Sequence, residues 1–282
     1  MRPCLHPRSA PATRRLTAVV AGLALSLVSF VSAPSAGATV RYPNSMAGLG
    51  DSITRAADVC CWYGDHPGQS WSTGGASWDG ITSHYERLLA VHPRIAGHNY
   101  NDAVSGAKAR DLPGQASKAV AQGAQYVTIL MGANDLCTSS ASTMTSVADF
   151  TGYVRSALAA LHQGLPRAHI FVSSIPDIYQ LWSVLHSNLL AEAVWALAGI
   201  CQSMLSTSNT ETDRQQVVAR ELAFNQVLAD ECHAVANCRW DGDTTYNYKF
   251  SASQVSTLDY FHPSLSGQAA LARVTWAASW WA

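Results

Sequence analysis

The sequence predicts an α/β fold, a three-layer α/β/α sandwich with a central parallel sheet. Short apolar segments at 46–50, 126–131 and 169–173 have the length and composition of buried strands, and segments with helical spacing lie between them. Strands that alternate with helices form a parallel sheet covered by helices on both faces. No repeat or Pro/Gly/Ser linker divides the chain, so one domain is expected over 39–282.

The first half of this domain alternates strands and helices around one long loop. Segment 46–50 is the first strand, and Gly50 permits a sharp turn from it into an expected helix. Segment 57–79 is rich in glycine and tryptophan, and a loop of this length is usually functional or cross-linked. The remaining elements expected here are a helix at 81–91, a short strand at 99–104 and a helix at 112–121.

The second half continues the alternation. Segment 126–131 is the clearest buried strand and is followed by Gly132, while the strand at 169–173 is ended by Pro176. A long helix is expected from about residue 212, with an apolar face that extends to Val235. The remaining elements expected here are a helix at 143–162, a less regular segment at 178–201 and a last helix at 264–276.

Residues 1–38 have the organisation of a secretory signal peptide. Arginines precede an apolar run at 16–31, and Ala36-Gly37-Ala38 supplies a small-residue cleavage site. The run is short for a membrane span, and no other stretch approaches about 18 apolar residues. We therefore expect a secreted protein without a stable membrane anchor, whose mature domain begins at Thr39.

The mature domain is mildly acidic. Without residues 1–38 it has 14 basic and 19 acidic residues, a net charge of −5, and it has no cluster of lysine or arginine. Nucleic acid and anionic membranes are therefore poor partners for it.

The mature domain contains an even number of cysteines, which in an exported protein implies disulfides. Cys232 and Cys238 are close enough in sequence for a local bridge. If Cys137 pairs with Cys201, the neighbours Cys60 and Cys61 remain, and a bond between adjacent residues is strained. The six candidates for disulfide bonding are Cys60, Cys61, Cys137, Cys201, Cys232 and Cys238.

Four segments with chemically useful residues follow predicted strand ends: 50–52, 101–106, 132–135 and 259–262. Because the carboxyl ends of parallel strands share one edge of a sheet, these segments can converge. Acyl transfer needs a nucleophile, a base, a group that orients the base, and donors for an oxyanion.

Each of these roles has a candidate residue. Ser52 is the nucleophile, His262 is the base, and Asp259 lies three residues earlier, where it can fix the tautomer of the imidazole. The N–H groups of Ser52 and Gly106 and the side-chain amide of Asn134 are candidates for the oxyanion hole. The N-terminus of the helix expected after Ser52 would also suit an anion.

Each residue also has a structural interpretation. Ser52 and His262 could cap helices, and Asn134 could belong to an ordinary turn. Their occurrence together and in this order favours catalysis. Three neighbouring carboxylates are assigned structural roles in turns: Asp51, Asp102 and Asp135.

These segments resemble the four blocks of the GDSL, or SGNH, hydrolases. The first is Gly50-Asp51-Ser52-Ile53, with isoleucine in place of the leucine of the family's name. The glycine of the second block matches Gly106, the third matches Gly132-Ala133-Asn134-Asp135, and the last matches Asp259 to His262. The blocks occur in the family's order from residue 50 to 262.

The resemblance implies a flavodoxin-like three-layer fold and a secreted serine esterase or lipase similar to the bacterial enzymes. Ser52, His262 and Asp259 would be catalytic, with an oxyanion hole at Ser52, Gly106 and Asn134. Some relatives orient the histidine with a main-chain carbonyl instead of an acid. The expected substrate is a small-molecule or lipid ester, the expected enzyme is a monomer, and no cofactor or metal is expected.

Two other functions stay open on the sequence alone. The same site could remove acetyl groups from a polysaccharide, because aromatic residues in 57–79 can line an acyl pocket or stack on a sugar. A non-catalytic carbohydrate-binding or adhesin domain on this fold is the alternative from another class.

Overall fold

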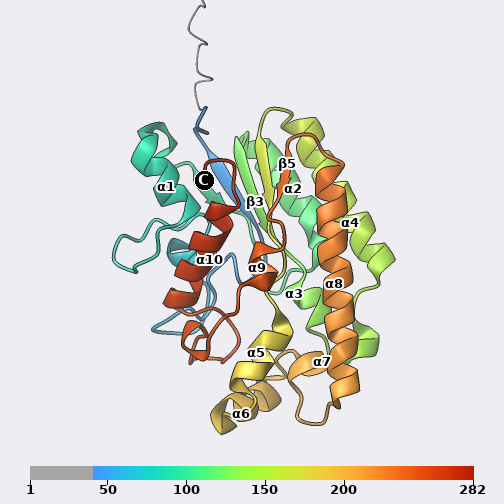
Figure 1. Cartoon of the computed structure of the whole chain (residues 1–282). Coiled ribbons are helices and arrows are strands. Elements are labelled where there is room, and N and C mark those ends of the chain that lie inside the picture. Colours follow the sequence, from blue (N-terminus) through green and yellow to red (C-terminus); the bar gives the residue numbers. More distant parts are fainter. Residues whose placement is uncertain (1–40) are drawn as a thin grey trace, which may run out of the picture. The chain divides into compact units, whose positions relative to one another are not determined.

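The structure is a computed structural model and describes residues 41–282, so the predicted signal peptide at 1–38 lies outside the described residues. Its centre is a five-stranded parallel sheet with the order β2-β1-β3-β4-β5. This confirms the predicted three-layer α/β/α fold (Figure 1). The strands are β1 (Met46–Gly50), β2 (Asn99–Asn101), β3 (Tyr126–Leu130), β4 (His169–Val172) and β5 (Cys238–Trp240).

Alternate residues of the central strands face the two helical layers. Tyr126 and Phe171 belong to one buried cluster, and Val127 and Ile170 belong to the other. This alternation buries both faces of the sheet, as the apolar strand sequences predict. The helices on one side are α1 (His84–Val91) and α10 (Leu265–Ala277), and those on the other are α2 (Leu112–Gln122), α4 (Val147–Gly164) and α8 (Glu211–His233) (Figure 1).

Capping residues determine where several helices begin. Helix α1 starts at His84, later than predicted, because Ser83 and Glu86 form a capping box with reciprocal side-chain and backbone hydrogen bonds. Thr210 and Asp213 form the corresponding box at α8, and the Ser264 side chain caps α10. These caps satisfy N–H groups that would otherwise lack partners.

The irregular segment predicted at 178–201 forms short helices beside the carboxyl edge of the sheet (Figure 1). A disulfide joins Cys201 to Cys137, the residue that follows the short helix α3 (Ala133–Leu136), and Ser203 N–H donates to Thr138 O at 2.8 Å. A second disulfide joins Cys232 to Cys238, as the sequence predicted. The helices are α5 (Ile178–Leu185), α6 (Leu189–Ala198) and α7 (Gln202–Leu205).

The local structure differs from the sequence predictions at four points. The residues after Ser52 form consecutive turns instead of a helix, and Ala56 and Asp58 there have positive φ angles of 50° and 52°. Helix α8 ends at His233, so Val235 lies beyond it, and the edge strand β5 that follows was not predicted. A short helix α3 (Ala133–Leu136) was also missed. Over residues 41–282, none of the helices combines the length and the hydropathy that a bilayer span requires.

Candidate active site

The end of strand β1 is shaped so that only glycine fits at position 50. Gly50 has a φ of +145°, and a Cβ there would lie 2.2 Å from the carbonyl oxygen of Leu130 on the adjacent strand β3. The buried amide of Gln115 on α2 binds both sides of this residue, accepting from Gly50 N–H at 2.8 Å and donating to Gly50 O at 2.9 Å. The close contact with β3 and the two hydrogen bonds to Gln115 therefore fix the backbone of Gly50, from which the chain continues to Ser52.

Ser52 lies in the first of the turns that follow β1. Asp51 is fully buried, and its Oδ1 accepts from Ile53 N–H at 2.9 Å, which closes the turn around Ser52. Burial raises the pKa of Asp51 to about 6, although this backbone hydrogen bond opposes the shift. The sequence predicted a helix after Ser52 whose dipole would stabilise an anion. Because the chain forms turns there instead, this contribution to the site is missing.

A loop before α10 brings His262 to Ser52. Val255 and Pro263 form an antiparallel bridge, and Ser256 N–H donates to the carbonyl of His262 at 2.8 Å. At the tip, Tyr260 has a φ of +56°, and its carbonyl accepts from the indole N–H of Trp195 at 2.9 Å. Helix α6, which carries Trp195, therefore supports the conformation of this loop.

The structure brings the three predicted catalytic residues together. His262 Nε2 lies 2.7 Å from Ser52 Oγ, and His262 Nδ1 is hydrogen-bonded to Asp259 Oδ2. The other oxygen of Asp259 accepts from the backbone N–H groups of Phe261 and His262 at 2.9 and 3.1 Å. This arrangement fits an Nδ1–H tautomer of His262, with Nε2 free to accept the proton of the serine.

The charges around His262 favour its protonated form. Burial lowers the pKa of the imidazole, but the hydrogen bond and charge of Asp259, with the charges of Asp58 and Asp51, raise the pKa above its ordinary value. Burial raises the pKa of Asp259, but the hydrogen bond to His262 and the charge of His262 lower it, so that the pKa of Asp259 lies below its ordinary value. An ionised acid beside a basic imidazole is the arrangement that a general base needs.

The three predicted oxyanion donors line one groove with Ser52 and His262. Among the described residues, the N–H groups of Ser52 and Gly106 have no hydrogen-bond acceptor. Gly106 has a φ of +80° and open space where a Cβ would stand, so a ligand can approach its backbone. The side-chain amide of Asn134, from α3, donates to Ala107 O at 3.0 Å and retains a second N–H.

The remaining carboxylates that the sequence assigned to turns accept hydrogen bonds from other segments of the chain. Asp135 accepts from Ala109 N–H at 2.8 Å and from Thr145 Oγ at 2.7 Å, and so connects three segments below the groove. Asp102 accepts from the side-chain amide of Gln122 at 3.0 Å.

Asp58 is an acid beside His262 that the sequence analysis did not consider. Its Oδ2 lies 3.9 Å from His262 Nδ1, while Oδ1 accepts from Gly64 N–H at 2.6 Å. Its position depends on a turn with positive φ, so no sequence pattern connects it with a histidine 204 positions later. His262 therefore has two carboxylates beside the same nitrogen.

Asp58, Asp259 and His262 also offer ligand atoms that lie within 4.8 Å of one another. The imidazole Nδ1 already has a hydrogen bond with Asp259, and a cation could bind there only by replacing it. This set of donors fits an acid–base pair better than a metal site.

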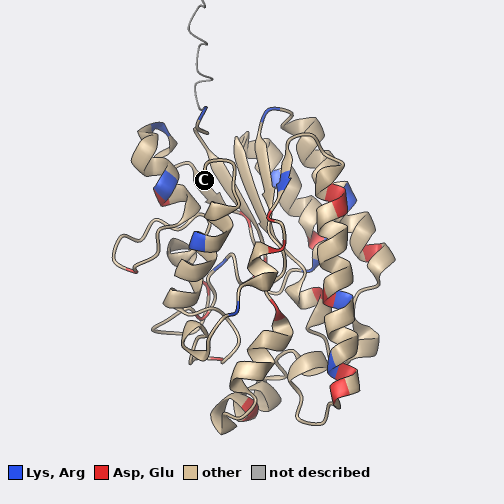
Figure 2. Cartoon of the chain, viewed as in Figure 1, with Lys and Arg blue, Asp and Glu red and all other residues tan. Residues whose placement is uncertain are grey.

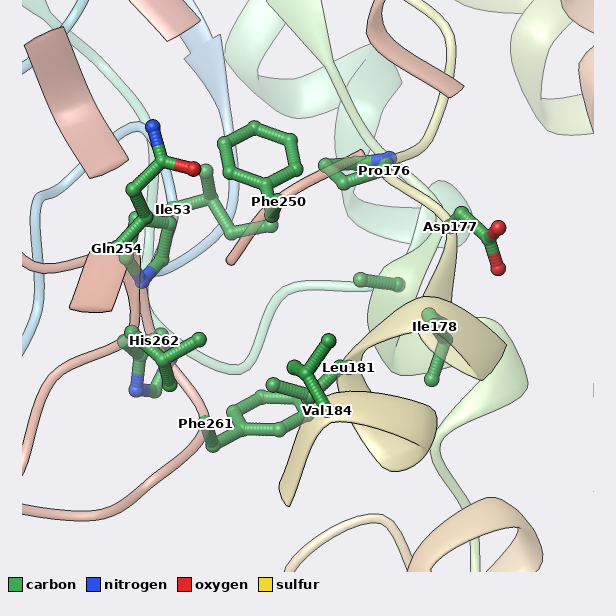
Figure 3. Close-up of a pocket in the computed structure, with 13 residues that line it drawn as sticks. Ile53, Pro176, Asp177, Ile178, Leu181, Val184, Phe250, Gln254, Phe261 and His262 are labelled. Carbon is green, nitrogen blue, oxygen red and sulfur yellow. The ribbon is translucent and has the colours of Figure 1, made fainter. Parts of the chain in front are cut away.

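Two cavities of different character meet at His262. One is narrow and apolar and runs between the loop of His262 and helix α5 (Figure 3). The other is the wider groove that contains Ser52, with a volume of about 660 Å³ against about 70 Å³ for the apolar pocket. Apolar residues that line the narrow pocket include Ile53, Ile178, Leu181, Val184, Phe250 and Phe261.

Cys60 and Cys61 are free thiols in the loop beside the groove, whereas the other four candidates form the two disulfides. The Sγ atoms of the neighbours lie 2.7 Å apart, a longer distance than the 2.01 and 2.03 Å of the two disulfides. Burial raises the pKa of the Cys60 thiol to about 11, and its neighbour Cys61 adds to the shift.

Comparison with known proteins relates this geometry to a family. The profile of the family described as "GDSL-like Lipase/Acylhydrolase" matches residues 46–274. The chain is 27% identical over 210 residues to "Phospholipase B1, membrane-associated" of Mus musculus and 25% identical over 225 residues to the Homo sapiens protein of that name. These alignments cover 63% and 67% of this chain but only 14% and 15% of the relatives.

Solved structures with the same fold are more distant in sequence. LAE5, described as an alpha/beta hydrolase enzyme from the metagenome of Lake Arreo, Spain, has a TM-score of 0.52 at 17% identity. A putative GDSL-like lipase from Parabacteroides merdae has a TM-score of 0.50 at 16% identity. Each alignment covers 83% of this chain and 94% of the other, so the likeness extends over nearly the whole fold.

Proposed function

Because the chain belongs to the GDSL-like lipase and acylhydrolase family, we propose that it is a secreted serine hydrolase that cleaves carboxylic esters through an acyl-enzyme intermediate. One observation carries this proposal: Ser52 Oγ lies 2.7 Å from the Nε2 of a histidine whose other nitrogen is bonded to Asp259. Donors for an oxyanion line the same groove.

The proposed reaction has two halves. Ser52 Oγ attacks the ester carbonyl carbon while His262 Nε2 takes the hydroxyl proton, and the oxyanion accepts hydrogen bonds from Ser52 N–H, Gly106 N–H and Asn134. Collapse of this intermediate breaks the bond to the alcohol, which receives the proton from His262. Water then attacks the acyl-serine by the same route, and the acid leaves as Ser52 regains its proton.

The apolar pocket beside His262 supports acyl esters, including lipids, as substrates. Its walls are almost entirely apolar, as a hydrocarbon chain requires (Figure 3). The groove on the other side of His262 also carries polar groups such as Asp65 and Ser105. The acyl group would occupy the pocket and the alcohol the groove. The relatives named as phospholipase B1 agree with a lipid substrate.

Export is part of the proposal. The signal peptide predicted at 1–38 and the two disulfides are both typical of proteins that mature in an oxidising compartment.

Deacetylation of a polysaccharide is the second candidate. The groove is wide and open, Tyr63 lines it, and the adjacent Trp62 is exposed, so aromatic rings are available to stack on a sugar. An acetyl group would make little use of the apolar walls that Ile178, Leu181 and Val184 supply, and for this reason we favour longer acyl groups.

The deciding experiment is hydrolysis of p-nitrophenyl esters from acetyl to palmitoyl by the chain that begins at Thr39. We expect activity to vanish in Ser52→Ala and to persist in Ser105→Ala, a matched serine of the same groove whose hydroxyl donates to Asp65. An optimum beyond acetyl supports a lipid or other acyl ester, and acetyl alone supports the deacetylase. Activity that survives in Ser52→Ala contradicts the proposed nucleophile.

A further inference from the structure

Helix α6 is apolar on every side and yet lies at the surface. Its sequence is Leu-Leu-Ala-Glu-Ala-Val-Trp-Ala-Leu-Ala, with Glu192 as its single charged residue. Leu189, Leu190 and Leu197 are 80%, 66% and 89% exposed. A helix that is hydrophobic all round is normally buried, so the outer face of α6 lacks the apolar contact that its sequence predicts.

The inner face of α6 borders the candidate active site. Ala191 and Trp195 are buried, and Val194 and Ala198 line the groove that holds Ser52. The disulfide at Cys201 and the hydrogen bond from Trp195 to the His262 loop hold the helix in place. The exposed leucines are therefore continuous with the wall of the groove.

The loop on the other wall of the groove adds exposed aromatic rings. Tyr63 lines the groove and donates to Leu258 O at 3.0 Å, and both Trp62 and Tyr63 are mostly exposed. We call the set Trp62, Tyr63, Leu189, Leu190 and Leu197 the rim patch. Tryptophan, tyrosine and leucine are the residues that insert at the boundary between lipid headgroups and acyl chains.

The charged residues near the rim patch indicate which kind of lipid surface it can bind. Segment 178–205, which contains α5, α6 and α7, has no lysine or arginine, and Figure 2 shows these helices almost entirely uncharged. Attraction to anionic lipids would need basic residues at the surface. The rim patch therefore fits a neutral lipid surface that it enters through apolar contact.

We propose that the rim patch rests on the surface of a neutral phospholipid layer, so that the groove opens directly onto its substrate. This inference depends on the proposed function, since it explains how a lipid ester reaches Ser52. The side chains of Leu190 and Leu197 enter the layer, while Val194 and Ala198 stay in the wall of the groove.

Flotation with phosphatidylcholine vesicles tests binding without turnover when the protein carries Ser52→Ala. We expect it to float with the vesicles at both low and high salt, because the contact is apolar. Adding Leu190→Gln and Leu197→Gln should weaken binding by roughly tenfold or more. The matched control is Leu222→Gln on α8, where a leucine is 49% exposed away from the rim patch, and it should bind as before.

Activity separates this inference from the proposed function. With an intact Ser52, the Leu190→Gln/Leu197→Gln variant should lose hydrolysis of esters in vesicles and keep hydrolysis of dissolved p-nitrophenyl acetate. Loss of both activities, or vesicle binding equal to that of the Leu222→Gln control, overturns the docking surface. Sedimentation velocity tests the alternative that the rim patch binds a second copy of the chain. A wild-type dimer that the leucine substitutions convert to a monomer would overturn the lipid proposal.

Discussion

Replacing Asp58 by asparagine tests whether this acid controls the charge of His262. The substitution keeps an oxygen that can accept from Gly64 N–H, so the turn should survive, but it removes a negative charge 3.9 Å from His262 Nδ1. Because that charge helps to raise the pKa of His262, its removal should lower the pKa. The neutral imidazole, which is the proposed base, would then persist to lower pH.

The size of the shift follows from the distance. Two unit charges 3.9 Å apart interact by about 4 kcal/mol at an effective dielectric constant of 20, which is equivalent to about three pH units. This is an upper bound, since the Asp58 side chain is 18% exposed and solvent screens the pair. We expect the acid limb of kcat/KM to move down by about one pH unit.

The assay is the pH profile of kcat/KM for p-nitrophenyl acetate, which reports the pKa of the free enzyme. Asp65→Asn is the matched control, because this groove acid pairs with Arg55 at 2.9 Å and does not contribute to the pKa of His262. In an Asp259→Asn background, loss of Asp58 should reduce kcat/KM by a further tenfold or so, since no carboxylate then remains beside Nδ1. An unmoved acid limb together with no further loss in the double variant would refute this account of Asp58.

Three other perturbations have defined outcomes. Asn134→Ala should lower kcat by roughly a hundredfold or more with an unchanged melting temperature, and normal turnover would remove Asn134 from the oxyanion hole. Leu181→Trp should fill the apolar pocket, so that octanoyl ester hydrolysis falls at least about tenfold relative to acetyl ester hydrolysis; a parallel fall in both would place the acyl group elsewhere. Reduction of Cys137–Cys201 and Cys232–Cys238 should destabilise the fold by about 2–5 kcal/mol, and an unchanged melting temperature in reductant would contradict this.

The fold was predictable from sequence wherever a strand is buried on both faces. Strand β3 is fully buried, and all its residues except Thr128 are apolar or aromatic, which makes it easy to recognise. Strand β5 pairs only with β4, is three residues long and contains the exposed Arg239, so its sequence carries no comparable signal. The turns after Ser52 were missed because Ala56 and Asp58 adopt positive φ without being glycine.

The candidate site shows the same division between local and long-range information. Asp259 and His262 could be paired from sequence because three residues of one loop join them. Asp58 and Gln115 could not, because their relation to His262 and Gly50 exists only after the sheet and helix α2 have assembled. Motifs thus identify the candidate reactive residues, whereas packing determines which other side chains hold them or adjust their charge.

The arrangement of the two cavities constrains how a substrate can bind. In the proposed reaction, an ester carbonyl at Ser52 Oγ has its oxygen toward Gly106 and Asn134, and its two substituents must then point in different directions. His262 stands between the apolar pocket and the polar groove, and it must deliver its proton to the oxygen of the leaving alcohol. Placing the acyl chain against Leu181 leaves the alcohol on the groove side, where released product can diffuse away and water can reach the acyl-serine. The opposite orientation would put the polar alcohol against hydrocarbon, at a cost in desolvation.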